Sequence, residues 1–195
     1  MSNSNDCKAH VGHVGNSGIQ GHSCGDDFPV IVTLIGGYPR ADNSAFYRVS
    51  NQGISNDCKS REDRDRFVAR HKCAERIADA IWAAWKDSNG SGCSVGCAGY
   101  AGCPDDGYLA SYKGQEKCVR LADFSYRDVY AYVHGRVGNV GLSDFYGLWA
   151  HDGYVFLDVS QHFADRDDCV DFAAKHDQIA YFDCEDKVSR DVRYA

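Results

Sequence analysis

The stretch from Phe145 to Asp186 constrains the fold more than any other part of this 195-residue chain. Two runs rich in β-forming residues flank Asp152-Gly153, a dipeptide that tolerates the positive φ angles of a tight hairpin. A helical pattern follows, and then a strand from Gln178 to Phe182. The sequence therefore predicts a compact strand–strand–helix–strand unit, and this unit carries no recognised catalytic motif.

Two more helices are predicted upstream, and each begins with a capping box. In this motif a serine and an acidic residue three positions later satisfy the free amides of the first turn. The two pairs are Ser60 with Asp63, and Ser125 with Asp128. Apolar residues then recur at steps of three and four along 67–85 and at steps of four along 129–137, which is typical of amphipathic helices.

The order of the expected elements sets the fold class. Strands are predicted at Pro29 to Ile35, Ala45 to Val49, Tyr108 to Tyr112 and Lys117 to Leu121. We therefore expect an α+β fold with two halves, each a small sheet covered on one face by a helix, and with a C-terminal β-β-α-β unit. Three regions are predicted: a flexible segment at 1–27, an α+β region with a Gly/Cys-rich loop at 28–142, and the module at 143–195.

The charge of the chain is uneven and restricts the class of partner. Residues 1–97 carry 11 basic and 11 acidic side chains, whereas residues 98–195 carry 10 and 17, so the net charge of -7 comes from the second half. Duplex-binding proteins usually carry a basic excess that neutralises phosphates, so nucleic acid is an unexpected partner. An acidic half suits a basic protein partner, although it also serves solubility.

The sequence shows no targeting segment. The first residues, MSNSNDCKAH, lack the apolar core of a signal peptide, and the apolar run Val30 to Ile35 is too short to cross a bilayer. We therefore expect a soluble cytoplasmic protein without membrane contact. In that compartment the ten cysteines are expected to be thiols rather than disulfides.

Two groups of residues have side chains of the kind that bind zinc. The first is Cys7, His10, His13, His22 and Cys24, in a polar segment that is more typical of a disordered tail. The second is Cys93, Cys97 and Cys103, with Cys118 beyond them, where glycines would let the chain wrap around an ion. Neither group has paired C-x2-C knuckles, and free thiols are the alternative. No other cofactor is expected.

Catalytic patterns are sparse. Gly36 to Arg40 follows a strand but lacks the GK[ST] ending of a phosphate-binding loop, so a turn is expected there. At the end of another strand, Asp158 and His162 suggest a small acid–base site, in which the carboxylate would orient the imidazole as a general base. Polar residues at a strand end also serve as loop and cap groups, which is the alternative interpretation.

Four carboxylates gather at the start of the last predicted helix: Asp165, Asp167, Asp168 and Asp171. Negative charge there is stabilised by the positive end of the helix dipole, and this needs no partner. Four acidic residues in seven positions nevertheless exceed what capping requires. We therefore expect the surplus to steer a basic partner toward this surface.

The last third of the chain contains the pattern GLWxxDGYVFLDVS, a helix and then DQIAYFD, with Gly147, Trp149, Gly153, Leu157, Asp158, Gln178, Ile179 and Asp183. Through these residues about a quarter of the chain resembles a module of uncharacterised proteins encoded by phages of actinobacteria. The resemblance implies an intracellular phage product and no particular activity. The functional hypothesis is an accessory protein that binds a host or phage protein. The alternatives are a small enzyme using Asp158 and His162, and a zinc-stabilised interaction module.

Overall fold

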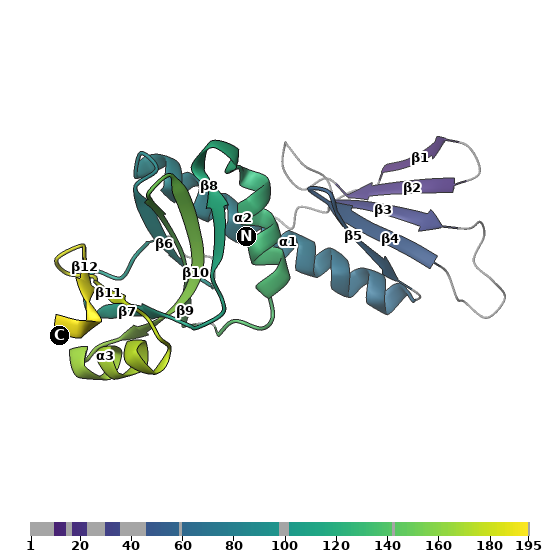
Figure 1. The fold of residues 1–195 in the computed structure, drawn as a ribbon. Coiled ribbons are helices and arrows are strands. Elements are labelled where there is room, and N and C mark those ends of the chain that lie inside the picture. The colour runs from purple at the N-terminus through teal and green to yellow at the C-terminus, as the bar shows by residue number, and fades with distance from the viewer. Residues whose placement is uncertain are drawn as a thin grey trace, which may run out of the picture. The chain divides into compact units, whose positions relative to one another are not determined.

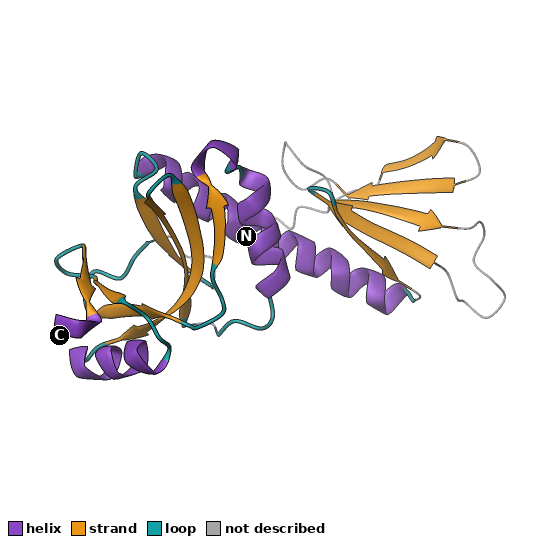
Figure 2. Cartoon of the chain, in the orientation of Figure 1, coloured by secondary structure: helices purple, strands orange, loops and turns teal. Residues whose placement is uncertain are grey.

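The computed structural model describes residues 10–14, 17–22, 30–35, 46–58, 60–97, 102–141 and 143–194. The fold is α+β, as predicted (Figure 2). The chain forms two compact units, residues 1–74 and residues 75–195, and each is described by itself. The boundary lies inside the long helix α1, Arg61–Asp87.

The first unit is a five-stranded antiparallel sheet in which every strand pairs with its neighbours in the chain (Figure 1). The strands are β1 His10–Val14, β2 Ser17–His22, β3 Val30–Ile35, β4 Phe46–Asn51 and β5 Ile54–Cys58. Positive φ angles at Gln52 and Gly53 make the tight turn between β4 and β5. The segment 1–27 was predicted to be flexible, but it contains β1 and β2. Glycine- and histidine-rich strands show no apolar alternation, so the pattern could not indicate them.

Helix α1 begins where the capping box predicted. The backbone N–H of Asp63 donates to Oγ of Ser60 at 3.0 Å, which confirms the cap. Within the second unit, Ile77, Ala78, Ile81 and Trp85 are buried along one side of the helix. The helix ends where Asn89 and Gly90 adopt positive φ, and the N–H of Gly90 donates to the carbonyl of Trp85.

The second unit is built on a seven-stranded sheet. Its strand order is β12-β11-β7-β10-β9-β6, and β8 also pairs with β10. The strands are β6 Gly92–Gly96, β7 Tyr108–Ser111, β8 Lys117–Arg120, β9 Asp144–His151, β10 Tyr154–Phe163, β11 Ala180–Asp183 and β12 Val188–Asp191. The helical segments that follow α1 are η1 Leu121–Asp123, α2 Tyr126–Arg136, α3 Arg166–Lys175 and η2 Val192–Tyr194.

The predicted β-β-α-β unit corresponds to β9, β10, α3 and β11. The turn between β9 and β10 has positive φ at Asp152 and Gly153, as the dipeptide indicated. The expected boundary between 142 and 143 does not separate two bodies, however. Strand β7 lies between β10 and β11, and β6 and β8 pair with β9 and β10, so strands from both sides of that boundary form one sheet.

The two faces of this sheet have different neighbours. Its helix-backed face carries Tyr146 and Leu148 of β9 and Val155, Leu157 and Val159 of β10, all buried. The ring of Tyr132 in α2 packs edge-on against that of Tyr146, with centroids 6.1 Å apart. The thiol of Cys93 in β6 contacts the carbonyl of Ile81 in α1, and α3 covers the same face near Ala110. The opposite side, the open face, carries the alternate residues Trp149, Tyr154, Phe156, Asp158 and Ser160.

Candidate functional site

Two stacked aromatic side chains lie on the open face of the seven-stranded sheet. Trp149 and Phe156 are direct cross-strand partners in β9 and β10, so their side chains project from the same face. Their rings are stacked, with centroids 4.4 Å apart and planes 16° from parallel. Trp149 is nevertheless 41% exposed, and Tyr154, on the same face, is 40% exposed. Large aromatic side chains with this exposure are typical of binding surfaces.

A buried carboxyl group supports the indole of Trp149. Asp158 is only 8% exposed and accepts a hydrogen bond from Oγ of Ser111 at 3.0 Å and one from Ser160 at 3.4 Å. Burial raises the pKa of Asp158, while hydrogen bonds from Ser111, Trp149 and Ser160 oppose that shift. The indole is therefore stacked on Phe156, next to a buried carboxyl group that Ser111 and Ser160 hold in place.

The absence of a side chain at Gly147 makes room for this arrangement. Gly147 is the direct cross-strand partner of Asp158, and a Cβ atom there would overlap Oδ1 of Asp158. The carboxyl group of Asp158 thus packs directly against the backbone of Gly147. Glycine is needed at this position because of the close approach, and it does not reflect a turn.

Protein-family models, curated proteins and solved structures contain no match to this chain. The inference about function therefore rests on the geometry of the site. Among the described residues, no helix has the length and apolar character required to span a membrane.

Asp158 and His162 lie four positions apart on β10, but their hydrogen bonds lead to different partners. Nε2 of His162 lies 2.9 Å from the carbonyl oxygen of Asp106, and a carbonyl can only accept, so this nitrogen carries the proton. The Asp158 carboxyl instead meets Ser111 and Ser160. The carboxyl group therefore belongs to a hydrogen-bond network with Ser111 and Ser160, whereas the imidazole contacts the loop before β7.

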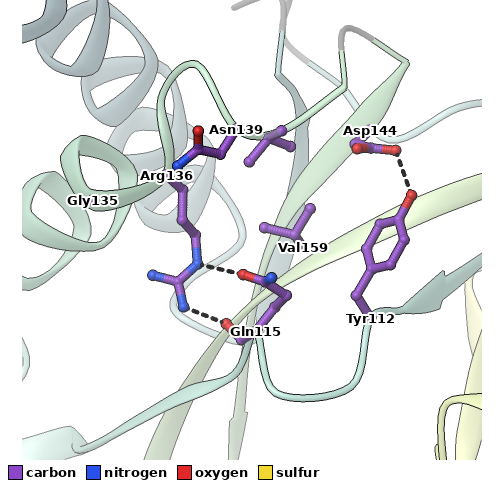
Figure 3. Close-up of a pocket in the computed structure, with 8 residues that line it drawn as sticks. Tyr112, Gln115, Gly135, Arg136, Asn139, Asp144 and Val159 are labelled. Carbon is purple, nitrogen blue, oxygen red and sulfur yellow. Dashed lines mark hydrogen bonds between the residues drawn. The ribbon is translucent and has the colours of Figure 1, made fainter.

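A polar pocket lies on the helix side of the sheet, beside the C-terminal end of α2 (Figure 3). It has a volume of about 490 Å³, and its lining residues are Tyr112, Gln115, Gly135, Arg136, Asn139, Val140, Asp144 and Val159. The hydroxyl of Tyr112 donates to Oδ1 of Asp144 at 3.1 Å, and Arg136 donates to the side-chain and backbone oxygens of Gln115. Burial, and then the nearby Asp144, raises the pKa of Tyr112 to about 12.

The charged groups that line the pocket are thus already paired within the protein. The guanidinium of Arg136 also lies 3.8 Å from the ring centroid of Tyr132. The sequence pattern did not indicate this pocket, because its residues come from the β7–β8 loop, from α2 and the segment after it, and from β9 and β10, and they match no motif. Its contacts tie α2 to the sheet.

The four predicted carboxylates of the acidic helix occupy exposed positions at the start of α3. Asp165 is the N-cap residue, and its side chain accepts from the backbone N–H groups of Asp167 and Asp168 at 2.8 and 3.2 Å. Asp165 therefore has the structural role that capping predicts. Asp167, Asp168 and Asp171 add negative charge to the solvent side of the helix.

The predicted metal-binding cysteines are placed apart. Cys93 and Cys97 lie at β6 on the helix side, where burial raises the pKa of each thiol to about 12, and Cys118 is exposed on β8. Cys103 instead lies beside Cys184, with 3.9 Å between the sulfurs. In the described part of the chain no three potential metal-binding side chains cluster. The N-terminal group of Cys7, His10, His13, His22 and Cys24 lies outside the described side chains.

Proposed function

We propose that the protein is a phage-encoded accessory protein that binds a host or phage protein on the open face of its seven-stranded sheet. The observation that carries the proposal is the exposed but immobilised Trp149. The resemblance of residues 145–186 to phage-encoded modules supports the assignment to a phage product, and the encounter would then take place in the cytoplasm of the host cell.

Preorganisation is the physical reason to favour binding. An exposed tryptophan on a flexible element loses side-chain entropy when a partner immobilises it, and that loss weakens association. The ring of Trp149 is already restrained before binding, because Phe156 stacks on it with the centroids 4.4 Å apart. Its apolar surface is therefore available at little further entropic cost, as in the aromatic anchors of known interfaces.

A protein partner fits the open face better than a nucleic acid. Single-stranded nucleic acids also stack on aromatic rings, but they require a basic groove along the backbone. The second half of the chain has instead 17 acidic and 10 basic side chains. The expected partner places apolar side chains over Trp149 and Tyr154 and carries basic groups at its rim.

The test compares capture by tagged wild-type protein, by Trp149→Ala and by Ile179→Ala in extracts of the host. Ile179 is a matched control, because it is 76% exposed in the same unit but outside the open face. A protein retained by wild type and Ile179→Ala is then purified, and its affinity for all three chains is measured. We expect Trp149→Ala to weaken binding at least tenfold, as hot-spot truncations of about 2 kcal/mol do.

The variant Trp149→Phe tests how much of the binding depends on the aromatic ring and how much on the indole N–H. It keeps an aromatic ring for the stack with Phe156 but removes the indole N–H, so we expect a smaller loss of affinity than with alanine. Equal affinity of wild type and Trp149→Ala for every captured protein, with matching melting temperatures, would rule out the open face as the binding surface.

A further inference from the structure

Two cysteines far apart in the sequence lie together at one end of the seven-stranded sheet. Sγ of Cys103 is 3.9 Å from Sγ of Cys184, and the residues are 81 positions apart. A disulfide bond has a sulfur–sulfur distance of about 2.05 Å, so closure needs an approach of about 1.9 Å. Side-chain rotation supplies movements of that size.

The backbone around both cysteines is held in place by several contacts. The N–H of Cys184 donates to the carbonyl of Gly107 at 2.9 Å, and Nζ of Lys187 donates to the carbonyl of Pro104 at 2.9 Å. Strands β7 and β11 pair next to these contacts, with Asp183 opposite Tyr108. The two sulfurs are therefore neighbours because of the fold, and the link would not require the sheet to move.

The two thiols differ in accessibility. Cys184 is fully buried, and burial raises its pKa to about 12. Cys103 is half-buried, and burial raises the pKa of its thiol as well, although the hydrogen bond with Cys184 and the nearby ammonium of Lys187 oppose this shift. Since the thiolate is the attacking species, Cys103 is the residue that reacts first with an external oxidant.

We propose that Cys103 and Cys184 form a reversible redox site, which closes to an intramolecular disulfide by exchange with a low-molecular-weight disulfide such as oxidised glutathione. The Cys103 thiolate attacks one sulfur of glutathione disulfide, releases one glutathione thiolate and leaves a mixed disulfide. Cys184 attacks the Cys103 sulfur and releases the second glutathione, whose thiolate takes up the proton that Cys184 loses. Two protein thiols are oxidised, and one glutathione disulfide is reduced to two thiols.

The link would fasten the segment before β7 to the turn after β11. That segment carries the carbonyl of Asp106, which accepts from His162 of β10. Oxidation would thus restrain one end of the sheet. It would also shorten the unfolded chain by closing a long loop, which favours the folded state.

The experiment equilibrates reduced protein with mixtures of reduced and oxidised glutathione, quenches with acid and maps the peptides by mass spectrometry. We expect a peptide pair linked through Cys103 and Cys184, reversed by dithiothreitol, in wild type and in the control Cys118→Ser. Cys118 is a suitable control because it is exposed on β8 and remote in the strand order from β11. The oxidised protein should melt on the order of 10 °C higher.

Two variants test the order of the steps. Cys184→Ser should stop at the mixed disulfide and gain one glutathione at Cys103, whereas Cys103→Ser should leave Cys184 reduced. If the buried serine of Cys184→Ser prevents that variant from folding, the result for Cys103→Ser still tests the order of the steps. Failure to find the linked peptide at any glutathione ratio, or a link that lowers the melting temperature, would overturn the proposal.

Discussion

The two faces of the seven-stranded sheet are built from alternate residues of the same strands, yet they are stabilised in different ways. On the helix-backed face, Leu148, Val155 and Leu157 are buried among apolar neighbours. On the open face, two residues of β9 and β10 are an exposed tryptophan and a buried carboxyl group, Trp149 and Asp158. The first face is stabilised by burial of apolar area. The second uses hydrogen bonds and stacking to hold an aromatic ring toward solvent, which the stability of the sheet alone does not require.

The largest effect should come from the helix-backed face. Replacing fully buried Leu157 by alanine removes apolar contacts and leaves a cavity, so we expect the free energy of unfolding to fall by about 2–5 kcal/mol in urea titrations. The control is Tyr154→Ala, three positions away on the same strand but on the open face, where we expect a loss of no more than about 1 kcal/mol. Equal losses would contradict the division into two faces.

The next effect tests the close approach on the open face. In Gly147→Ala the added Cβ overlaps Oδ1 of Asp158, so we expect a loss of about 1–3 kcal/mol. The double variant Gly147→Ala with Asp158→Ala should lose less than the sum of the two single losses, because the overlapping carboxyl is gone. Gly135→Ala is the matched control, since a Cβ there meets nothing within 4 Å and alanine favours a helix. Strict additivity would refute the contact.

Local features of the fold were predictable, whereas pairings between distant residues were not. The cap of α1 at Ser60 and the turn at Asp152-Gly153 depend on neighbouring residues, so the sequence pattern indicated both. Strand β6 was not expected, because glycine and serine residues around Gly92 are typical of a loop that ends a helix. The insertion of β7 between β10 and β11 depends on partners far along the chain, and no local pattern reports strand order.

The candidate site shows the same limit. Asp158 was selected from its position at a strand end, and Trp149 from a resemblance, but their relation requires the register of β9 and β10. The contact between Cys103 and Cys184 also depends on the pairing of β7 with β11. The sequence indicated which residues could take part in a site. It did not indicate which of these residues contact one another in the folded protein.

A pH-dependent effect distinguishes Asp158 on the open face from Leu148, Val155 and Leu157 on the helix-backed face, whose side chains do not titrate. Burial raises the pKa of Asp158 above its ordinary value, so the folded protein keeps this proton where the unfolded chain loses it. Stability from this group is therefore complete below the ordinary aspartate pKa of about 3.9 and is lost as pH rises toward the raised pKa.

Asparagine at position 158 does not titrate and provides the reference. We expect the free energy of unfolding of wild type, minus that of Asp158→Asn, to decrease as pH rises from about 4 toward neutrality. Denaturant titrations of both proteins at each pH give this difference directly. A difference that stays constant, or that increases with pH, would contradict a raised pKa for the buried carboxyl of Asp158.

The smallest effects concern α3, the helix that covers one end of the helix-backed face and carries its acidic residues into solvent. Asp165 caps the helix through the N–H groups of Asp167 and Asp168, so Asp165→Ala should lower the free energy of unfolding by about 1 kcal/mol. Asp171 is exposed and plays no part in the cap, and the side chain of Asp167 is exposed as well. The double variant Asp167→Asn, Asp171→Asn should therefore change stability by less than about 0.5 kcal/mol.

The same double variant tests the acidic surface as an aid to binding. Removing two charges should slow association with a basic partner at low salt and leave the rate unchanged at high salt, because electrostatic steering is screened by ions. The measurement is a series of association rates against salt concentration, using the protein retained by wild type but lost with Trp149→Ala. If the rates of wild type and variant coincide at every salt concentration, the surplus carboxylates serve solubility. The open face would then bind its partner without help from α3.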